Sequence, residues 1–282
     1  MLTSWRGLVS AAVAAATLTA CGPGPQEIEA SFKDYHEGLV IRGLMRDARA
    51  PSDAPFTRDD LVENYIRIAL GREAIFDQEA KTVPLARWVK PIRYRVYGPG
   101  ADAETRAAID AYARRLVGLT GHEIREWSGE AEATYAPLDI FVANNRQRRS
   151  VARDALDQNN SGWIRETIQD FLTIGSNYHP CYVRLYVGND GIIDAGVVLI
   201  RSETQGLFRQ ACIEEELAQA LGLGNDDPRV RPSIFNDDQE FALLTAHDEL
   251  LLRIHYDDRL RPGMDEAEVR AVIDPIVREV YP

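Results

Sequence analysis

The chain has 282 residues and a formal net charge of −12 at neutral pH. An acidic chain of this kind repels nucleic-acid phosphates and anionic lipid surfaces, so the charge argues against a nucleic-acid-binding function. The length suits one large domain, or one domain with a short extension.

The first twenty residues have the features of an export signal. Arg6 precedes an apolar, alanine-rich run at 8–18 that is too short to remain as a membrane span. Leu18-Thr19-Ala20-Cys21 then fits the lipobox of bacterial lipoproteins, which are cut before the cysteine and acylated on it. The alternative is an ordinary secretory signal with an incidental cysteine. We predict a signal peptide at 1–20 and a lipid anchor on Cys21, with Gly22 favouring the outer membrane and the periplasm.

The rest of the chain is predicted to form a tether at 21–55 and one domain at 56–282. The tether opens with Gly22-Pro23-Gly24-Pro25 and shows no strong apolar periodicity. Apolar spacing and polar caps predict helices at 57–71, 101–119, 206–222, 238–255 and 265–280. Alternating or apolar runs predict strands at 92–97, 138–142, 181–187 and 193–200, the last two forming a hairpin. This order of elements predicts an α+β fold.

Two cysteines, Cys181 and Cys212, remain once Cys21 carries lipid. Because the periplasm is oxidising, a pair of cysteines in an exported chain favours a disulfide. The alternative is two free, buried thiols. The bridge would tie the strand that starts at Cys181 to the helix that contains Cys212, and would stabilise the fold by roughly 3–4 kcal/mol.

The stretch from Glu215 to Asp226 has the spacing of a helical metal site. Such a site needs two ligands at i and i+4 and a carboxylate beside the first ligand to polarise a metal-bound water. It also needs a glycine that turns the chain toward a third ligand. Glu216 and Gly222 occupy the positions of the carboxylate and the glycine. The three ligand positions carry no histidine: they hold Glu215, Gln219 and Asn225.

This stretch resembles the active-site helix of metzincin zinc proteases with the three histidines replaced. Ser233-Ile234-Phe235-Asn236 follows where those enzymes place their methionine turn, and Phe235 takes the methionine position. The resemblance implies a zincin-like fold, with a mixed sheet, an active-site-type helix and C-terminal helices. It also implies that the strands at 181–187 and 193–200 form an antiparallel edge beside a substrate cleft.

A closer resemblance is to an uncharacterised family of bacterial envelope lipoproteins, the domain of unknown function 2927. It covers about residues 50–270 and implies a fold and a compartment but no reaction. The matching segments are Asp53-Ala54-Pro55-Phe56, Leu85-Ala86-Arg87-Trp88, 212–237, Leu244-Thr245 with Asp248, and Tyr256-Asp257, Arg259-Leu260 and Pro262-Gly263-Met264. The chain departs from the family at Asp258, where members commonly carry proline.

The residues at the ligand positions form a weak metal site. Zinc prefers imidazole and thiolate, so one carboxylate and two amides suit it poorly. Calcium accepts such oxygens but needs six or more, and only Glu216, Asp226 and water add to the set. His247 and His255 are about 12 Å apart along one predicted helix and cannot share a metal. We therefore predict no metal cofactor, with zinc and calcium as the alternatives to test.

Two functions fit these residues. The first is a non-catalytic, zincin-like lipoprotein that binds a peptide or an envelope protein. The alternative is an atypical metal-dependent hydrolase or peptidase that uses Glu216 as its general base. Without metal, crowding among Glu215, Glu216, Asp226, Asp227 and Asp237 would raise their pKa values and could support acid–base chemistry such as glycoside hydrolysis.

Structural roles are also predicted for several of these residues. Gln219 and Asn225 are expected to bond the backbone of the turn loop, where a metal would otherwise link the two segments. Arg259 is expected to pair with an acid of the 215–237 region, and Gly263 to permit the turn before the last helix.

Overall fold

The structure is a computed structural model that describes residues 24–71, 82–129, 135–144, 146–147, 150–151, 153–154 and 179–282. The predicted signal peptide and Cys21 lie outside these residues. Within them, the chain forms an α+β fold of six helices and one five-stranded sheet. No helix in the described ranges has the length and apolar character needed to cross a membrane.

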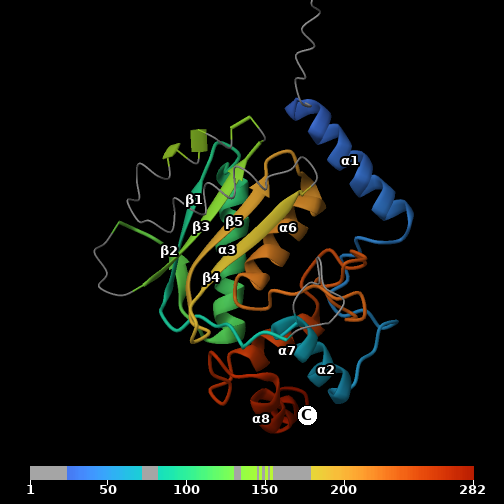
Figure 1. Cartoon of the computed structure of the whole chain (residues 1–282). Coiled ribbons are helices and arrows are strands. Elements are labelled where there is room, and N and C mark those ends of the chain that lie inside the picture. The colour runs from blue at the N-terminus through green and yellow to red at the C-terminus, as the bar shows by residue number, and fades with distance from the viewer. Residues whose placement is uncertain are drawn as a thin grey trace, which may run out of the picture.

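The sheet is mixed and has the strand order β2-β1-β3-β5-β4. The parallel strands β1 (Ile92–Tyr97), β2 (Ile124–Glu126), β3 (Ala136–Ala143) and β5 (Ile193–Arg201) form most of it. The remaining strand, β4 (Cys181–Val187), pairs antiparallel with β5. The predicted hairpin and its antiparallel direction are therefore confirmed, and β4 lies at one edge of the sheet (Figure 1).

The central strands are apolar along their length because both of their faces are covered. β3 and β5 are almost entirely buried, which is typical of central parallel strands, whereas β4 is half-buried. The one charged side chain within β3, Asp139, is paired with Arg95 at 2.8 Å. Burial raises the pKa of Asp139 to about 6 despite this partner.

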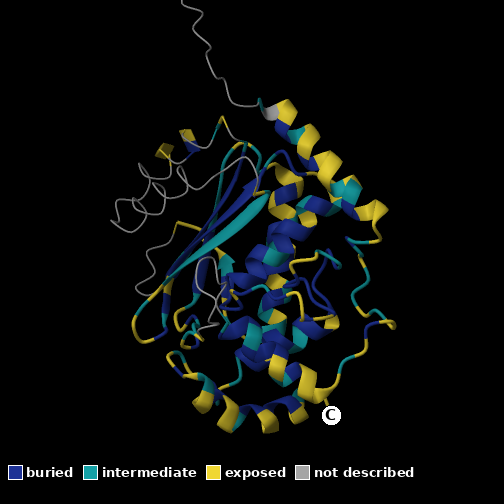
Figure 2. Ribbon diagram, turned by 45° about the vertical axis from the view of Figure 1, so that its right-hand side comes forward, coloured by how far each residue is buried: buried dark blue, intermediate teal, exposed yellow. Residues whose placement is uncertain are grey.

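Helices α3 (Ala103–Thr120) and α6 (Gly206–Gln219) lie side by side against the sheet (Figure 1). Asp102 caps α3 at its start, and Gly121 ends it with a left-handed backbone. Below them α2 (Arg58–Ala69), α7 (Ala246–His255) and α8 (Glu266–Val280) pack together. Figure 2 shows the buried residues concentrated between these layers.

Most predicted elements are present, with some shifts in their ends. The helix expected at 238–255 begins only at Ala246, because Thr245 and Asp248 form a reciprocal capping box there. β2 was not predicted, since three residues are too short to show a pattern, and it exists through parallel pairing with β1.

The segment predicted to be a tether contains a helix, α1 (Pro25–Ile41), which the absence of strong apolar periodicity did not indicate. Ile28, Phe32 and Leu39 form its buried face. Phe32 contacts Phe208 of α6 edge to face, with ring centroids 6.3 Å apart. The apolar positions are widely spaced among charged residues, so α1 gains its stability from docking rather than from its own pattern.

The predicted disulfide is confirmed between Cys181 and Cys212, with the two α-carbons 5.6 Å apart. It joins the edge strand β4 to the middle of α6. The bridge closes a sequence separation of 31 residues, and in the chain-entropy picture it stabilises the fold by about 3–4 kcal/mol. It therefore fixes α6 against the sheet just before the predicted metal-site residues.

Candidate functional site

The predicted metal-site stretch begins on α6 and continues into the turn that follows. α6 ends at Gln219, three residues earlier than predicted, and Gly222 turns the chain with a φ of +111°. A β-carbon on Gly222 would overlap the carbonyl oxygen of Ala86 and would lie 2.6 Å from Nε2 of His255. Glycine is thus required here by its backbone angle and by the close approach of a second segment.

Aromatic side chains from other segments close the end of α6. The indole nitrogen of Trp88 donates to the carbonyl of Ala220 at 2.6 Å, and the hydroxyl of Tyr256 donates to the carbonyl of Leu221 at 3.1 Å. Helix ends leave carbonyl groups without partners within the helix, and these donors bind the carbonyls of the two residues that follow Gln219. The segments at 85–88 and 256–264, which the sequence singles out, therefore serve to position this helix end.

The amides at the second and third ligand positions are directed to different partners. Gln219 donates to Asp226 at 2.8 Å, and the side chain of Asn225 donates to the carbonyl of Arg67, at the end of α2, at 2.8 Å. The expectation that both bond the backbone of the turn loop is wrong. Asn225 instead ties this loop to α2, and both amide nitrogens are occupied within the protein.

Glu215 and Glu216 lie at the centre of an acidic cluster. Glu216 is buried, and its Oε2 atom has no hydrogen-bond partner. Burial first, and then the charges of Glu215 and Asp226, raises the pKa of Glu216 well above its ordinary value. The half-buried Glu215 has its pKa raised to about 8 by burial and by Asp226 and Asp237. At neutral pH these two carboxyl groups hold their protons far more strongly than exposed carboxyls do.

Asp227 does not join this cluster, although the sequence groups it there. Its carboxylate binds the guanidinium of Arg229, and Arg67 lies 3.8 Å away. The hydrogen bond from Arg229 lowers the pKa of Asp227, so this group stays ionised. The pKa values of Glu215 and Glu216 are raised, in part by the charges of Asp226 and Asp237, whereas that of Asp227 is lowered.

The turn loop that resembles a methionine turn is held by a buried aspartate of α7. Asp248 accepts hydrogen bonds from the hydroxyl of Ser233 at 2.5 Å and the backbone amide of Ile234 at 3.1 Å. It also accepts two from Thr245, at 2.8 and 2.9 Å. Phe235 is fully buried in the core cluster beside this loop. The loop is thus held by hydrogen bonds to Asp248 and by the packing of Phe235 in the core.

His247, His255 and Arg259 have hydrogen-bond and ion-pair partners other than the acids of the cluster. His247 contacts Asn64 at 3.0 Å, and His255 contacts both Tyr65 and a backbone carbonyl at 3.0 Å. Each of these two rings therefore has at least one hydrogen-bonding partner within the fold. Arg259 pairs with Asp257 and Glu279 rather than with an acid of the 215–237 region, so that expectation is wrong. Gly263 does provide the predicted turn, with a φ of +83°.

The residues at the ligand positions do not fit a zinc ion. Neutral amide oxygens are weak zinc ligands at two of the three positions, although Oδ1 of Asn225 has no hydrogen-bond partner among the described residues. Burial raises the pKa of Glu215 to about 8, which disfavours the ionised form that binds a metal. In the described part of the chain, no group of three or more His, Cys, Asp or Glu side chains is placed to hold a metal ion.

Sequence reasoning missed a second polar centre on the neighbouring face of α6. Glu214 is buried and accepts two hydrogen bonds from Arg49, at 2.6 and 2.8 Å, and one from the amide of Leu244 at 2.9 Å. Arg115 of α3 lies 3.7 Å from the same carboxylate. The sequence does not distinguish Glu214 from the adjacent Glu215 and Glu216, because the partners of Glu214 are far away in the chain.

The acidic cluster should make stability depend on pH in a defined direction. The unfolded chain releases the proton of Glu215 near its ordinary pKa of 4.5, whereas the folded protein keeps it until about pH 8. Stability is therefore lost as the pH rises through this window. The thermal unfolding midpoint should fall more between pH 5 and pH 8 for the native protein than for Glu215→Gln. An equal fall of the midpoint in the two proteins would contradict the raised pKa of Glu215. Asp258→Asn, which removes an exposed carboxylate, is the control and should behave as the native protein does.

The family model described as protein of unknown function (DUF2927) matches residues 58–275. No curated protein and no solved structure matches the chain. The match spans most of the chain and includes α2, the whole sheet, α6 and α7, but its description names no reaction.

Proposed function

We propose that this chain, which belongs to the DUF2927 family of proteins of unknown function, is an envelope lipoprotein with a protease-like domain that binds rather than cleaves its partner. The partner would be a peptide or an envelope protein in the periplasm. The observation that carries the proposal is the hydrogen bonding of the side-chain amides of Gln219 and Asn225. Gln219 and Asn225 donate to Asp226 and to the carbonyl of Arg67, so their hydrogen bonds take the place of metal coordination in holding these segments together.

The state of Glu216 also supports a non-catalytic role. A general base must be ionised and must reach the water that it activates. Burial and neighbouring acids raise the pKa of Glu216 well above its ordinary value, which disfavours its ionised form. A protonated carboxyl donates a proton and does not remove one, so this group is a poor base for peptide hydrolysis.

The proposed compartment rests on the lipobox ending in Cys21 and on the disulfide. A structural disulfide between Cys181 and Cys212 suits an oxidising compartment such as the periplasm. In the proposal, acylated Cys21 anchors the chain to the outer membrane, and the domain faces the periplasm.

An atypical hydrolase is the second candidate, and one observation favours it. Carboxyl groups with strongly raised pKa values gather at active sites more often than elsewhere, and Glu215 and Glu216 form such a pair. In this alternative Glu216 would act as the general base with a metal bound by unusual ligands.

A single preparation distinguishes the two candidates. Full-length protein purified from membranes without chelator should carry no stoichiometric metal by elemental mass spectrometry, and should not cleave unstructured peptides. Peptide cleavage that is lost in Glu216→Gln but kept in Asp258→Asn would establish the hydrolase instead. A stoichiometric metal lost in Glu215→Ala would do the same.

The binding role has its own test in intact cells. A photo-crosslinking amino acid at position 224, an exposed site within the motif, should yield a discrete adduct with one protein or peptide. The same amino acid at the exposed position 274, on α8, provides the control. Equal adducts at both positions, or none at 224, would contradict partner binding at this surface.

A further inference from the structure

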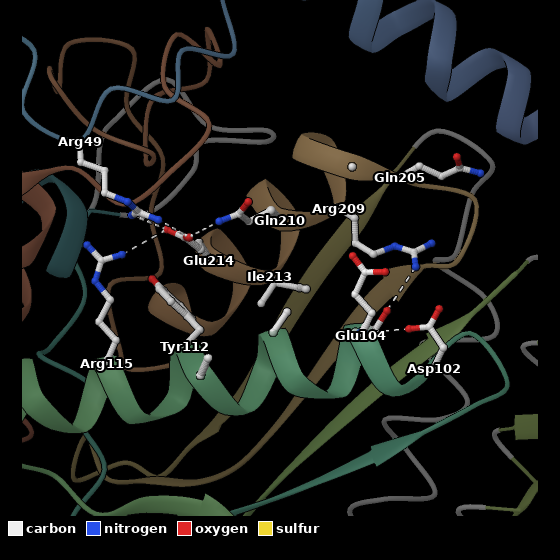
Figure 3. A pocket seen from close by; sticks show the side chains of 14 residues that line it. Arg49, Asp102, Glu104, Tyr112, Arg115, Gln205, Arg209, Gln210, Ile213 and Glu214 are labelled. Atoms are coloured by element: carbon white, nitrogen blue, oxygen red, sulfur yellow. Dashed lines mark hydrogen bonds and ion pairs between the residues drawn. The ribbon is translucent and has the colours of Figure 1, made fainter.

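The hollow between α3 and α6 has a volume of about 660 Å³, and the charged side chains at one end of it bind one another. Figure 3 shows Arg49 and Arg115 directed toward Glu214, whose carboxylate lies 2.6 Å from a nitrogen of Arg49 and 3.7 Å from one of Arg115. These groups make their polar contacts within the protein. A second hollow, of about 450 Å³, lies beside Trp127 at the carboxyl end of β1.

The alternation of side chains along β1 places this second hollow on the sheet face away from α3. Tyr94 donates to Asp110 of α3 at 2.9 Å, so its side chain faces α3. Successive side chains of a strand point to opposite faces, so Arg95 and Tyr97 lie on the other face. The backbone amide of Trp127 donates to the carbonyl of Tyr94 at 2.9 Å, which holds Trp127 beside β1. The carboxyl ends of parallel strands are a usual place for ligands in open sheets.

Aromatic rings and one guanidinium group form a row across this face. The guanidinium of Arg95 lies 5.9 Å from the ring centre of Trp127 and 5.9 Å from that of Tyr97. Tyr97 stacks on Phe141 of β3, with ring centres 5.2 Å apart. Asp139 fixes the guanidinium with two hydrogen bonds, of 2.8 and 3.0 Å. Trp127 ends the row and is 39% exposed, so it presents aromatic surface to solvent at the hollow.

Two carboxylates lie at the rim of the same hollow. Glu126, directly before Trp127, and Asp154 both line it, and both are exposed. Arg106 lies 3.6 Å from Glu126 in a solvent-exposed ion pair. A carboxylate has two oxygens and about four acceptor sites, so such a pair leaves it able to accept further hydrogen bonds. The accessible polar groups therefore favour a ligand that carries hydroxyl donors.

The charges around the hollow narrow the class of ligand. Glu126 and Asp154, within a chain of net charge −12, would repel an anion. A cation would meet the guanidinium of Arg95, which already lies over the ring of Trp127. A neutral ligand with an apolar face and several hydroxyl groups avoids both conflicts. A sugar ring fits this description, because the hydrogens of its C–H face complement the negative face of an aromatic ring and its hydroxyls lie around the edge.

We propose that this hollow binds a neutral sugar, with one sugar ring stacked on Trp127 and its hydroxyls donating to Glu126 and Asp154. The volume falls within the range of roughly 300–1,000 Å³ that is usual for small-molecule sites. A free saccharide and one unit of a longer glycan chain both offer this chemistry. The inference does not depend on the proposed partner binding, because none of the lining residues belongs to the 215–237 region.

Saturation-transfer NMR on the full-length protein, in a detergent without a sugar headgroup, tests the proposal. The neutral probes are cellobiose, N,N′-diacetylchitobiose and their tetrasaccharides; choline, glucuronate and adenosine represent a cation, an anionic sugar and a flat heterocycle. At least one neutral disaccharide should bind with a Kd of about 0.1–10 mM. Tighter binding of its tetrasaccharide identifies a glycan chain as the source, and equal binding identifies a single saccharide. Failure of every neutral sugar up to about 20 mM, or equal or tighter binding of any other probe, would overturn the proposal.

Trp127→Ala and Glu126→Gln test the two kinds of contact. Trp127→Ala should reduce the saturation transfer about fivefold or more, because the stacking surface is lost. Glu126→Gln should weaken binding less, since it replaces a charged acceptor with a neutral one. Val89→Ala, which shortens another exposed apolar side chain outside the hollow, should leave binding unchanged.

The unfolding midpoints of the three variants show whether a loss of binding reflects the site. All three should stay close to the native value, because the replaced side chains are exposed. Unchanged binding in Trp127→Ala would overturn the stacking. If Trp127→Ala lowered the midpoint, Glu126→Gln would decide the matter, and unchanged binding in that variant would overturn the assignment.

Discussion

Replacing Gly222 with alanine is expected to lower the free energy of unfolding by about 3–5 kcal/mol. The φ of +111° at this position lies in a region that L residues rarely adopt. The new methyl group would also overlap the carbonyl oxygen of Ala86, which is backbone and cannot move aside without moving its segment. Chemical denaturation followed by circular dichroism measures the loss.

Gly224→Ala provides a matched control two residues along the same turn. Gly224 is exposed, and a β-carbon there would have no atom within 4 Å. Its replacement should change stability by no more than about 0.5 kcal/mol. If both variants lost the same stability, general stiffening of the turn rather than the contact with Ala86 would explain the effect, and the argument for Gly222 would fail.

Asp248→Ala is expected to cost about 3–5 kcal/mol, or to prevent folding altogether. The carboxylate is fully buried and anchors the turn loop through Ser233 and Ile234 while capping α7 through Thr245. Its removal leaves the buried donors of Ser233, Ile234 and Thr245 without their acceptor. The yield of soluble protein and the denaturation midpoint both report this loss.

Asp274→Ala is the control for this change. Asp274 is exposed on α8, and alanine is the better helix former, so stability should stay within about 0.5 kcal/mol of the native value. An Asp248→Ala protein with near-native stability would show that the turn loop is held by its apolar contacts alone. The two variants test different parts of the site. Gly222→Ala tests the turn at the end of α6, and Asp248→Ala tests the loop that follows it.

The candidate site was located by the sequence but not described by it. The spacing of Glu215, Gln219 and Gly222 correctly indicated a helix that ends in a glycine turn. The same spacing gave no information on where the amides point. Asn225 bonds the carbonyl of Arg67, which is 158 positions away, and a pattern of neighbours cannot contain such a partner. The raised pKa of Glu216 likewise depends on burial by segments that are distant in the chain.

The sequence by itself determined the strands at 92–97, 181–187 and 193–200, the main helices and the pairing of Cys181 with Cys212. Each of these depends on local periodicity, on caps or on the count of cysteines, which are visible along the chain. Only the tertiary structure decided that 25–41 is a docked helix, that three residues at 124–126 extend the sheet, and that Glu214 pairs with Arg49. These features gain their stability from contacts with remote segments. A helix with a sparse apolar face, a very short strand and a buried ion pair are therefore fixed only when those segments have come together.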